Sequence, residues 1–131
     1  MAKSPITCHV LDASLGKPAE GVEVQLQEYK PVQSADAAFK FDPLARGHTN
    51  ADGRCVDLLP PCGSEEAKAQ NAHLEAGTYK IIFRTKEYFE KTGRQSFYPW
   101  VEIAFTVEDA SQHYHIPLLI SPYSYTTYRG S

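Results

Sequence analysis

Hydrophobic and polar residues alternate along much of this chain with a repeat of two positions. From residue 101 to residue 107, for example, every second side chain is large and apolar, and the side chains between are Glu, Ala and Thr. This repeat is typical of a β-strand with one face in a core, because successive side chains of a strand point to opposite faces of the sheet. Six segments are clear enough to be predicted as strands: 6–11, 22–26, 79–83, 101–107, 113–120 and 123–128.

Turn-forming residues separate the predicted strands. The sequence Asn-Ala-Asp-Gly at positions 50–53 predicts a tight turn. Residues 86–91 favour a short helix that ends at Gly93. The polar stretches 31–45 and 59–76 are predicted to be long loops. Together these elements predict an all-β fold, an antiparallel β-sandwich of seven or eight strands with one short helix.

Length and charge narrow the class of protein. A chain of 131 residues can form one domain with its own core, and we expect a single domain over residues 1–131. The 13 Lys and Arg residues and 16 Asp and Glu residues give a formal net charge of −3, so no positive surplus exists to neutralise nucleic acid or anionic lipid. No apolar run approaches the roughly 20 residues that span a bilayer, and the N-terminal residues lack the apolar region of a secretory signal.

The three cysteines, Cys8, Cys55 and Cys62, are odd in number and lack the spacing of metal ligands. Without a secretory signal they are expected to be reduced thiols of a cytoplasmic protein. Cys8 alternates with Ile6 and Val10, which predicts a small core residue. A peroxisomal location stays open, although the chain does not end in Ser-Lys-Leu.

Histidines stand on the outward face of two predicted strands. The outward-facing residues are Thr7, His9 and Leu11 in the first segment, and His113, His115, Pro117 and Leu119 in the segment 113–120. Apolar residues on an outer face indicate that another subunit covers it. Pro117 has no amide hydrogen and predicts an edge, a bulge or a local break.

Each polar candidate also has a simpler interpretation. His48 and His73 are expected to be solvated, and Arg54 has the alternative of holding a loop through a salt bridge. His113 and His115 share a face like half of a zinc site, but no carboxylate or Cys stands at matching spacing, so no metal is predicted. A Ser–His–acid triad is not indicated, because no Gly-x-Ser-x-Gly motif is present. On pattern alone, a binding module and an enzyme are equally favoured.

Three motifs carry a resemblance to a known family. The first is Cys-His-Val-Leu-Asp at 8–12 with Gly-Lys-Pro-Ala-Glu-Gly-Val at 16–22, and the second is Thr-Asn-Ala-Asp-Gly-Arg at 49–54. The third and most specific is the tail 113–131, which begins His-Tyr-His-Ile-Pro-Leu-Leu and ends Tyr-Arg-Gly-Ser. Over essentially its whole length the chain resembles the transthyretin-related family. The terminal Tyr-Arg-Gly-Ser is the mark that separates its 5-hydroxyisourate hydrolases from the hormone-carrying transthyretins.

The resemblance implies a prealbumin-like sandwich of eight strands and a short helix, assembled as a homotetramer with active sites in a channel between dimers. It also implies a hydrolase of urate (purine) breakdown, which opens the cyclic amide ring of 5-hydroxyisourate with water. Neither a cofactor nor a metal is implied. The stretches 31–45 and 59–76 are longer than is common in the family, and either narrow the channel entrance or only decorate the surface.

Carried over by motif position, the functional residues are His9, Arg54, His115 and the terminal Tyr-Arg-Gly-Ser. An unperturbed imidazole titrates near ~6.5, so both histidines suit proton transfer, and His115 is slightly favoured as the base that deprotonates water. Arg54 is expected to bind the substrate's carbonyl oxygens and to stabilise the oxyanion. Tyr128 and Ser131 are expected to shape the pocket and bond substrate or water, with Ser131 orienting rather than attacking.

Two other functions are alternatives to the hydrolase. A transthyretin-like carrier would have a channel lined by apolar and Lys or Glu residues rather than by two His and an Arg. An immunoglobulin-like adhesion domain would place its Trp between two cysteines, whereas Trp100 follows all three. The missing secretory signal and the terminal Tyr-Arg-Gly-Ser favour the enzyme. Within that enzyme, His113 either supports the site or belongs only to its interface.

Overall fold

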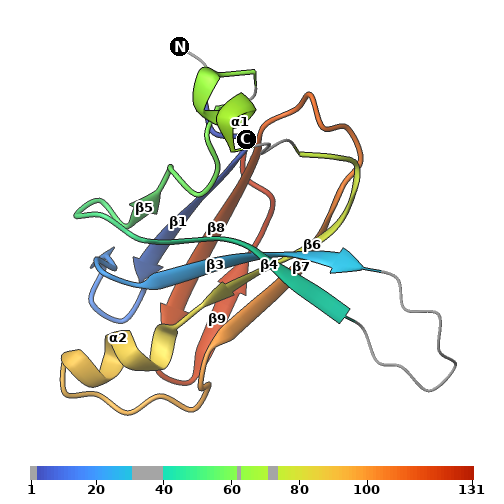
Figure 1. Cartoon of the computed structure of the whole chain (residues 1–131). Coiled ribbons are helices and arrows are strands. Elements are labelled where there is room, and N and C mark those ends of the chain that lie inside the picture. The colour runs from blue at the N-terminus through green and yellow to red at the C-terminus, as the bar shows by residue number, and fades with distance from the viewer. Residues whose placement is uncertain (1–2, 31–39, 62, 71–73) are drawn as a thin grey trace, which may run out of the picture.

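The computed structural model describes residues 3–30, 40–61, 63–70 and 74–131, which form two β-sheets packed face to face (Figure 1). The first sheet contains β1 (Ile6–Asp12), β2 (Lys17–Pro18), β5 (Arg54–Cys55), β8 (Tyr114–Ser121) and β9 (Ser124–Thr127). The second contains β3 (Glu23–Lys30), β4 (Lys40–His48), β6 (Gly77–Phe83) and β7 (Val101–Val107). Helices α1 (Glu65–Ala69) and α2 (Thr85–Lys91) lie at opposite ends of the sandwich, and neither is long and apolar enough to cross a bilayer.

The predicted β-sandwich is confirmed, and the number of its elements differs from the prediction. In the described residues there are nine strands, because β2 and β5 are two-residue strands that are too short to show a sequence repeat. There is also a second helix, α1, inside the stretch 59–76 that was predicted to be a loop. The side-chain oxygen of Ser64 caps α1 by accepting a 3.1 Å hydrogen bond from the amide of Ala67. Cys62 and His73, named in the predictions, lie outside the described residues.

One pair of strands departs from the antiparallel prediction and positions the site. β1 and β8 run parallel, with Thr7 opposite His115 and His9 opposite Pro117. β5 pairs antiparallel with the other edge of β1, which puts Arg54 opposite His9. Residues that are far apart in the sequence therefore meet on neighbouring strands of one sheet.

The second sheet is antiparallel, in the order β4-β3-β6-β7. It overturns part of the loop predicted at 31–45, because residues 40–45 belong to β4. β4 is a largely exposed edge strand whose polar sequence shows no repeat of two, so its backbone ladder with β3 defines it. Residues 31–39 of the predicted loop lie outside the described part of the chain.

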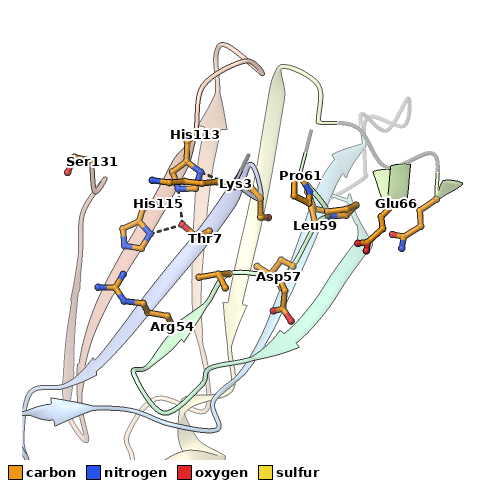
Figure 2. Close-up of a pocket in the computed structure, with 15 residues that line it drawn as sticks. Lys3, Thr7, Arg54, Asp57, Leu59, Pro61, Glu66, His113, His115 and Ser131 are labelled. Carbon is orange, nitrogen blue, oxygen red and sulfur yellow. Dashed lines mark hydrogen bonds between the residues drawn. The ribbon is translucent and has the colours of Figure 1, made fainter. Parts of the chain in front are cut away.

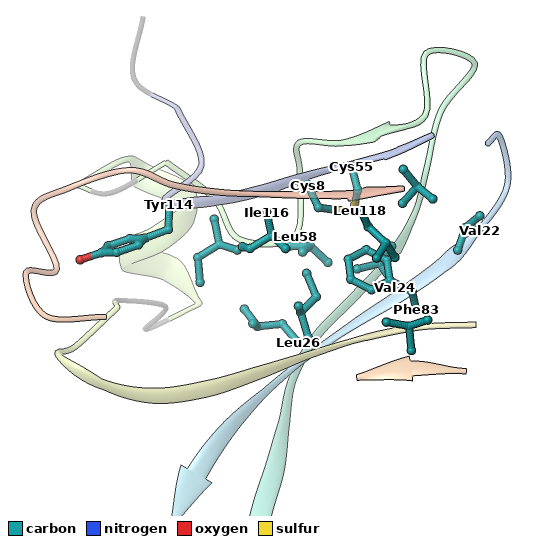
Figure 3. Packing of buried hydrophobic residues seen from close by; sticks show 14 of the residues in the cluster. Cys8, Val22, Val24, Leu26, Cys55, Leu58, Phe83, Tyr114, Ile116 and Leu118 are labelled. Carbon is teal, nitrogen blue, oxygen red and sulfur yellow. The ribbon is translucent and has the colours of Figure 1, made fainter. Parts of the chain in front are cut away.

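The core lies between the sheets (Figure 3). Ile6, Cys8 and Val10 of β1 are completely buried, as the repeat of two predicted. Cys8 and Cys55 face each other across β1 and β5 as free thiols. Hydrogen bonding with the Cys55 thiol and burial raise the pKa of the Cys8 thiol well above its ordinary value, so Cys8 is an uncharged packing residue.

A buried ion pair attaches the region of α2 to the first sheet. Asp12, at the end of β1, is fully buried and accepts hydrogen bonds from Nη2 of Arg94 (2.7 Å) and the hydroxyl of Tyr88 (2.8 Å). Burial alone would raise the pKa of Asp12, but hydrogen bonds from Arg94, Ser14 and Tyr88 lower it to about 2. α2 confirms the predicted helix, and Gly93 follows it with a left-handed φ of 73°.

Candidate active site

A cavity of about 580 Å³ opens where β1, β5 and β8 meet the last residues of the chain (Figure 2). Residues 57–61, Glu66 and Gln70 contribute the wall that faces these strands. The polar side chains that line the cavity include those of Thr7, Arg54, Asp57, His113, His115 and Ser131. Three residues predicted to be functional, Arg54, His115 and Ser131, are therefore brought to one cavity by the fold.

A tight turn fixes the point at which Arg54 enters the sheet. The Oδ1 atom of Asn50 accepts hydrogen bonds from the amides of Asp52 (2.9 Å) and Arg54 (3.0 Å), which confirms the turn predicted at this sequence. Gly53 adopts a φ of 77°, and a side chain there would collide with the carbonyl oxygen of Val10. The Asn and Gly of the motif are thus needed to aim the residue that follows them.

The Arg54 side chain is exposed and extends toward His115 (Figure 2). Among the described residues no carboxylate lies within ion-pair distance of its guanidinium, so the salt-bridge alternative finds no partner there. A guanidinium that is not neutralised by a carboxylate can donate paired hydrogen bonds to the oxygen atoms of a bound molecule.

A chain of hydrogen bonds links His115 to Thr7 and His113 (Figure 2). Its Nδ1 atom lies 2.8 Å from Oγ1 of Thr7, and the same oxygen lies 3.0 Å from Nε2 of His113. Nδ1 of His113 lies 2.9 Å from the carbonyl oxygen of Ser4. The Nε2 atom of His115 takes no part in this chain, so it is the ring nitrogen that remains for a ligand.

The surroundings of His115 favour its uncharged form. Burial lowers the pKa of His115 below its ordinary value of 6.5, and electrostatic interactions with Arg54, His113, His9 and Lys3 lower it further. An imidazole that is neutral at neutral pH carries a lone pair and can accept a proton. His115 therefore has the properties of a general base.

The C-terminal segment packs directly on His115. β8 runs through Pro117 in an unbroken parallel ladder with β1, and only the ladder with β9 ends beside this proline, at Leu118. Of the predicted edge, bulge or local break, the structure therefore shows the end of a ladder. Past that point, the amide of Gly130 donates a 2.9 Å hydrogen bond to the carbonyl oxygen of His115. Ser131 consequently reaches the wall of the cavity.

Two predicted site residues do not line this cavity. Tyr128 is exposed and lines a neighbouring cavity of about 240 Å³. His9 stands opposite Arg54, but its ring lies against the turn, and its Nε2 donates a 2.9 Å hydrogen bond to the carbonyl oxygen of Asp52. His48 is exposed on β4, as predicted.

Thr7 and Asp57 line the cavity and were not singled out as site residues from the sequence. The repeat of two predicts that Thr7 lies on the same outward face as His9, and no other feature of the sequence indicated that Thr7 belongs to the site. Its contact with His115 follows from the parallel pairing of β1 and β8, which no local motif encodes. Asp57 belongs to the segment after β5, where the sequence has no repeat that would orient a side chain.

The groups on the cavity wall are suited to proton transfer and to binding oxygen atoms. Imidazoles exchange protons near neutral pH, and a guanidinium binds carbonyl or carboxylate oxygens. In the part of the chain that the structure describes, no three His, Cys, Asp or Glu side chains are grouped so that they could hold a metal ion. A small, polar, oxygen-rich molecule is the ligand that fits this set of groups.

The sequence and the fold of this chain are similar to those of known proteins. The profile of the HIUase/Transthyretin family matches residues 6–130. The 5-hydroxyisourate hydrolase of Mus musculus is 43% identical over 129 residues, which cover 98% of this chain and 96% of that protein. The structure of the Klebsiella pneumoniae 5-hydroxyisourate hydrolase is similar with a TM-score of 0.71 and 33% identity, over 98% of this chain and 100% of that one. A crystal structure of transthyretin from Sparus aurata gives a TM-score of 0.74 and 30% identity, over 96% of each chain.

Proposed function

Since this chain belongs to the HIUase/transthyretin family, we propose that it is a hydrolase that opens the six-membered ring of 5-hydroxyisourate with water in urate breakdown. The product of that reaction is 2-oxo-4-hydroxy-4-carboxy-5-ureidoimidazoline. The similar mouse and Klebsiella proteins bear the name of this activity, which supports the substrate. The observation that carries the proposal is that Arg54, His115 and Ser131, from three distant parts of the chain, line one cavity.

His115 is the general base of the proposed reaction. Its Nε2 atom takes a proton from water while the water oxygen bonds to a ring carbonyl carbon of the substrate. The lowered pKa of His115 supports this role, because the ring is then neutral at physiological pH. His115 is preferred to His9 because it lines the cavity, whereas Nε2 of His9 is already bonded to the carbonyl oxygen of Asp52.

Arg54 stabilises the charge that develops as water adds. The carbonyl oxygen becomes an oxyanion, and the guanidinium donates hydrogen bonds to it at that stage. Protonated His115 then returns its proton to the ring nitrogen as the carbon–nitrogen bond breaks. The cleavage leaves a carboxylic acid and a ureido group on the same molecule. The acid holds the second hydrogen of the water and ionises to a carboxylate by releasing that proton to solvent, so all atoms of the water are accounted for without a cofactor.

The remaining site residues orient the reactants. Ser131 positions the water or the substrate through its hydroxyl, and it is not the nucleophile, since no described base is hydrogen-bonded to it. Tyr128 bounds the substrate site from the neighbouring cavity, which shares His115 with the main one. His9 binds substrate beside Arg54 through Nδ1, the nitrogen that its hydrogen bond to the turn leaves free.

The test is the ultraviolet decay of 5-hydroxyisourate, generated in place from urate by urate oxidase, with and without this protein. The native protein should accelerate the decay, and Arg54→Ala should lower kcat/KM by about 10²- to 10³-fold without unfolding the exposed site. Arg46→Ala is the matched control, because Arg46 lies on β4 and does not line the cavity. If the folded native protein gave no acceleration, the hydrolase would be rejected in favour of a carrier, and ligand binding to the cavity would be measured instead.

We further propose a homotetramer located in the cytoplasm. Leu11 and Leu119 are only half-buried on the sheet face that carries His115, where a second subunit would cover them. The facing free thiols of Cys8 and Cys55 support a reducing compartment. Size-exclusion chromatography with light scattering should give the mass of four chains, and the mass of one chain would contradict the tetramer.

A further inference from the structure

Hydrogen bonds link the carbonyl oxygen of Ser4 to His113, His113 to Thr7, and Thr7 to His115. When both imidazoles are neutral, only one assignment of donors and acceptors satisfies all three. The carbonyl oxygen of Ser4 can only accept, so Nδ1 of His113, 2.9 Å away, carries a hydrogen. A neutral imidazole has a single N–H group, so Nε2 of His113 must accept, and the Thr7 hydroxyl donates its one hydrogen to it. Oγ1 of Thr7 is then left with lone pairs only, and the 2.8 Å contact to His115 requires a hydrogen on Nδ1 of His115.

We propose that Thr7 and His113 are positioning residues that hold His115 in its Nδ1–H tautomer, with the lone pair on Nε2 facing the cavity. This inference rests on the proposed role of His115 as the general base. A base in the other tautomer would present an N–H group to the water and would be unable to take its proton. The tautomer is therefore a condition of the reaction, and it is set by two residues that need not touch the substrate.

The local packing keeps this hydrogen-bond chain intact. Thr7 is only 6% exposed and stands opposite His115 in the parallel ladder of β1 and β8. The rings of His113 and His115 lie nearly parallel, at 18° and 6.4 Å between centroids, so both present a nitrogen to the same hydroxyl. Because water has little access to Thr7, it does not compete for these hydrogen bonds.

The same geometry couples the base to the charge of His113. Protonated His113 has hydrogen on both nitrogens, so Thr7 would accept from His113 and donate to Nδ1 of His115. The hydrogen of neutral His115 would then lie on Nε2, and the base would be lost. The titratable and charged groups around His115 include Arg54 from β5, His9 from β1, His113 just before β8 and Lys3 from the N-terminal segment. Asp57 and Glu66 lie across the cavity, and Tyr128 and Arg129 line the neighbouring cavity together with His115.

The tautomer can be read directly by long-range proton–nitrogen NMR of protein labelled with ¹⁵N-histidine. The His115 signals are assigned by their loss in His115→Asn. The native protein should show the Nδ1–H tautomer for His115. Thr7→Val, which keeps the shape of the side chain and removes the hydroxyl, should lose that preference, and Thr7→Ser should keep it. His113→Leu should also weaken the preference, because the Thr7 hydroxyl is then free to donate to His115.

Kinetics provide the second readout. Thr7→Val should lower kcat by about 10- to 100-fold, less than the loss of a general base, while KM stays within about twofold. Its acid limb of kcat/KM should move to lower pH, because the imidazolium of His115 loses the acceptor for its Nδ1–H. Thr7→Ser should restore kcat to within about threefold of the native value.

Three results would overturn the inference: an Nε2–H tautomer in the native protein, full activity in Thr7→Val, or equal losses in Thr7→Val and Thr7→Ser. The last result would assign the loss to packing rather than to the hydroxyl. The NMR measurement does not depend on turnover. A protein that fails to hydrolyse 5-hydroxyisourate would therefore remove the proposed function without deciding the tautomer, and the two failures remain distinguishable.

Discussion

The amide of Gly130 donates a 2.9 Å hydrogen bond to the carbonyl oxygen of His115, and the same glycine packs against the His115 ring. A Cβ atom at position 130 would lie 2.7 Å from Cδ2 of that ring and 3.1 Å from Cγ of Pro117. The absence of a side chain at this position therefore allows the end of the chain to lie close to His115. It also places Ser131 in the cavity wall.

Gly130→Ala should lower kcat/KM by at least about tenfold, because the added methyl group displaces either the His115 ring or the terminal segment. The free energy of unfolding should change by less than about 1 kcal/mol, because Gly130 lies outside the core. Steady-state kinetics and urea unfolding measure both quantities. Gly16→Ala is the control: its φ is 68° but nothing surrounds it, so it should cost about 1 kcal/mol of stability and leave kcat/KM unchanged. Native kinetics in Gly130→Ala would show that the contact is not needed.

Asn50→Ala should change the position of the Arg54 side chain by loosening the turn that precedes it. The variant removes the acceptor of two amide hydrogen bonds in the turn, from Asp52 and Arg54, which should cost about 1–2 kcal/mol of stability. Because Arg54 leaves the backbone at this turn, kcat/KM should fall as well. Asn50→Asp retains the accepting oxygen and should stay near the native values in both measurements. Equal losses in the two variants would mean that the amide group of Asn50 has another role.

The pH dependence of the rate should report His115. Its pKa lies below 6.5, so the midpoint of the acid limb of kcat/KM, where the base becomes protonated, should lie below pH 6.5. Lys3→Gln removes one of the positive charges that lower this pKa, and it should move the acid limb toward higher pH. Lys17→Gln, on β2 and outside the cavity, should leave the profile unchanged. An acid limb above pH 6.5 in the native protein would contradict the environment described for His115.

Asp12 should contribute stability that depends on pH. Its folded-state pKa of about 2 lies below the ordinary 3.8, so the contribution, about 2 kcal/mol, is complete above pH 4 and disappears as the pH falls through 2. Asp12→Asn leaves Arg94 without its buried partner and should cost about 3 kcal/mol at pH 7. Urea unfolding at pH 7, 4 and 2.5 measures the free energy of unfolding of the native protein and of Asp12→Asn. The difference between these two free energies should shrink at the lowest pH. A pH-independent difference would mean that the charge of Asp12 does not act in this way.

The strands and their buried faces were predictable from the local sequence. Residues such as Ile6, Val10 and Ile116 alternate with outward-facing neighbours, and the structure buries them as that repeat requires. The turn before Arg54 was predictable for a similar reason, since Asn and Gly have local backbone preferences. Edge strand β4 and helix α1 were missed, because one is polar and held by its ladder with β3, and the other is a five-residue helix.

The identities of three proposed site residues, Arg54, His115 and Ser131, also followed from the sequence, through motifs of a family to which the chain belongs. Their assembly around one cavity did not follow from the sequence, and neither did the hydrogen bond between Thr7 and His115. Alternation states only which face of a strand a residue occupies. It is silent on which strand lies beside it and in which direction that strand runs. The parallel register of β1 and β8 depends on the packing of the whole sandwich, so only the tertiary structure could place a threonine from the start of the chain behind a histidine near its end.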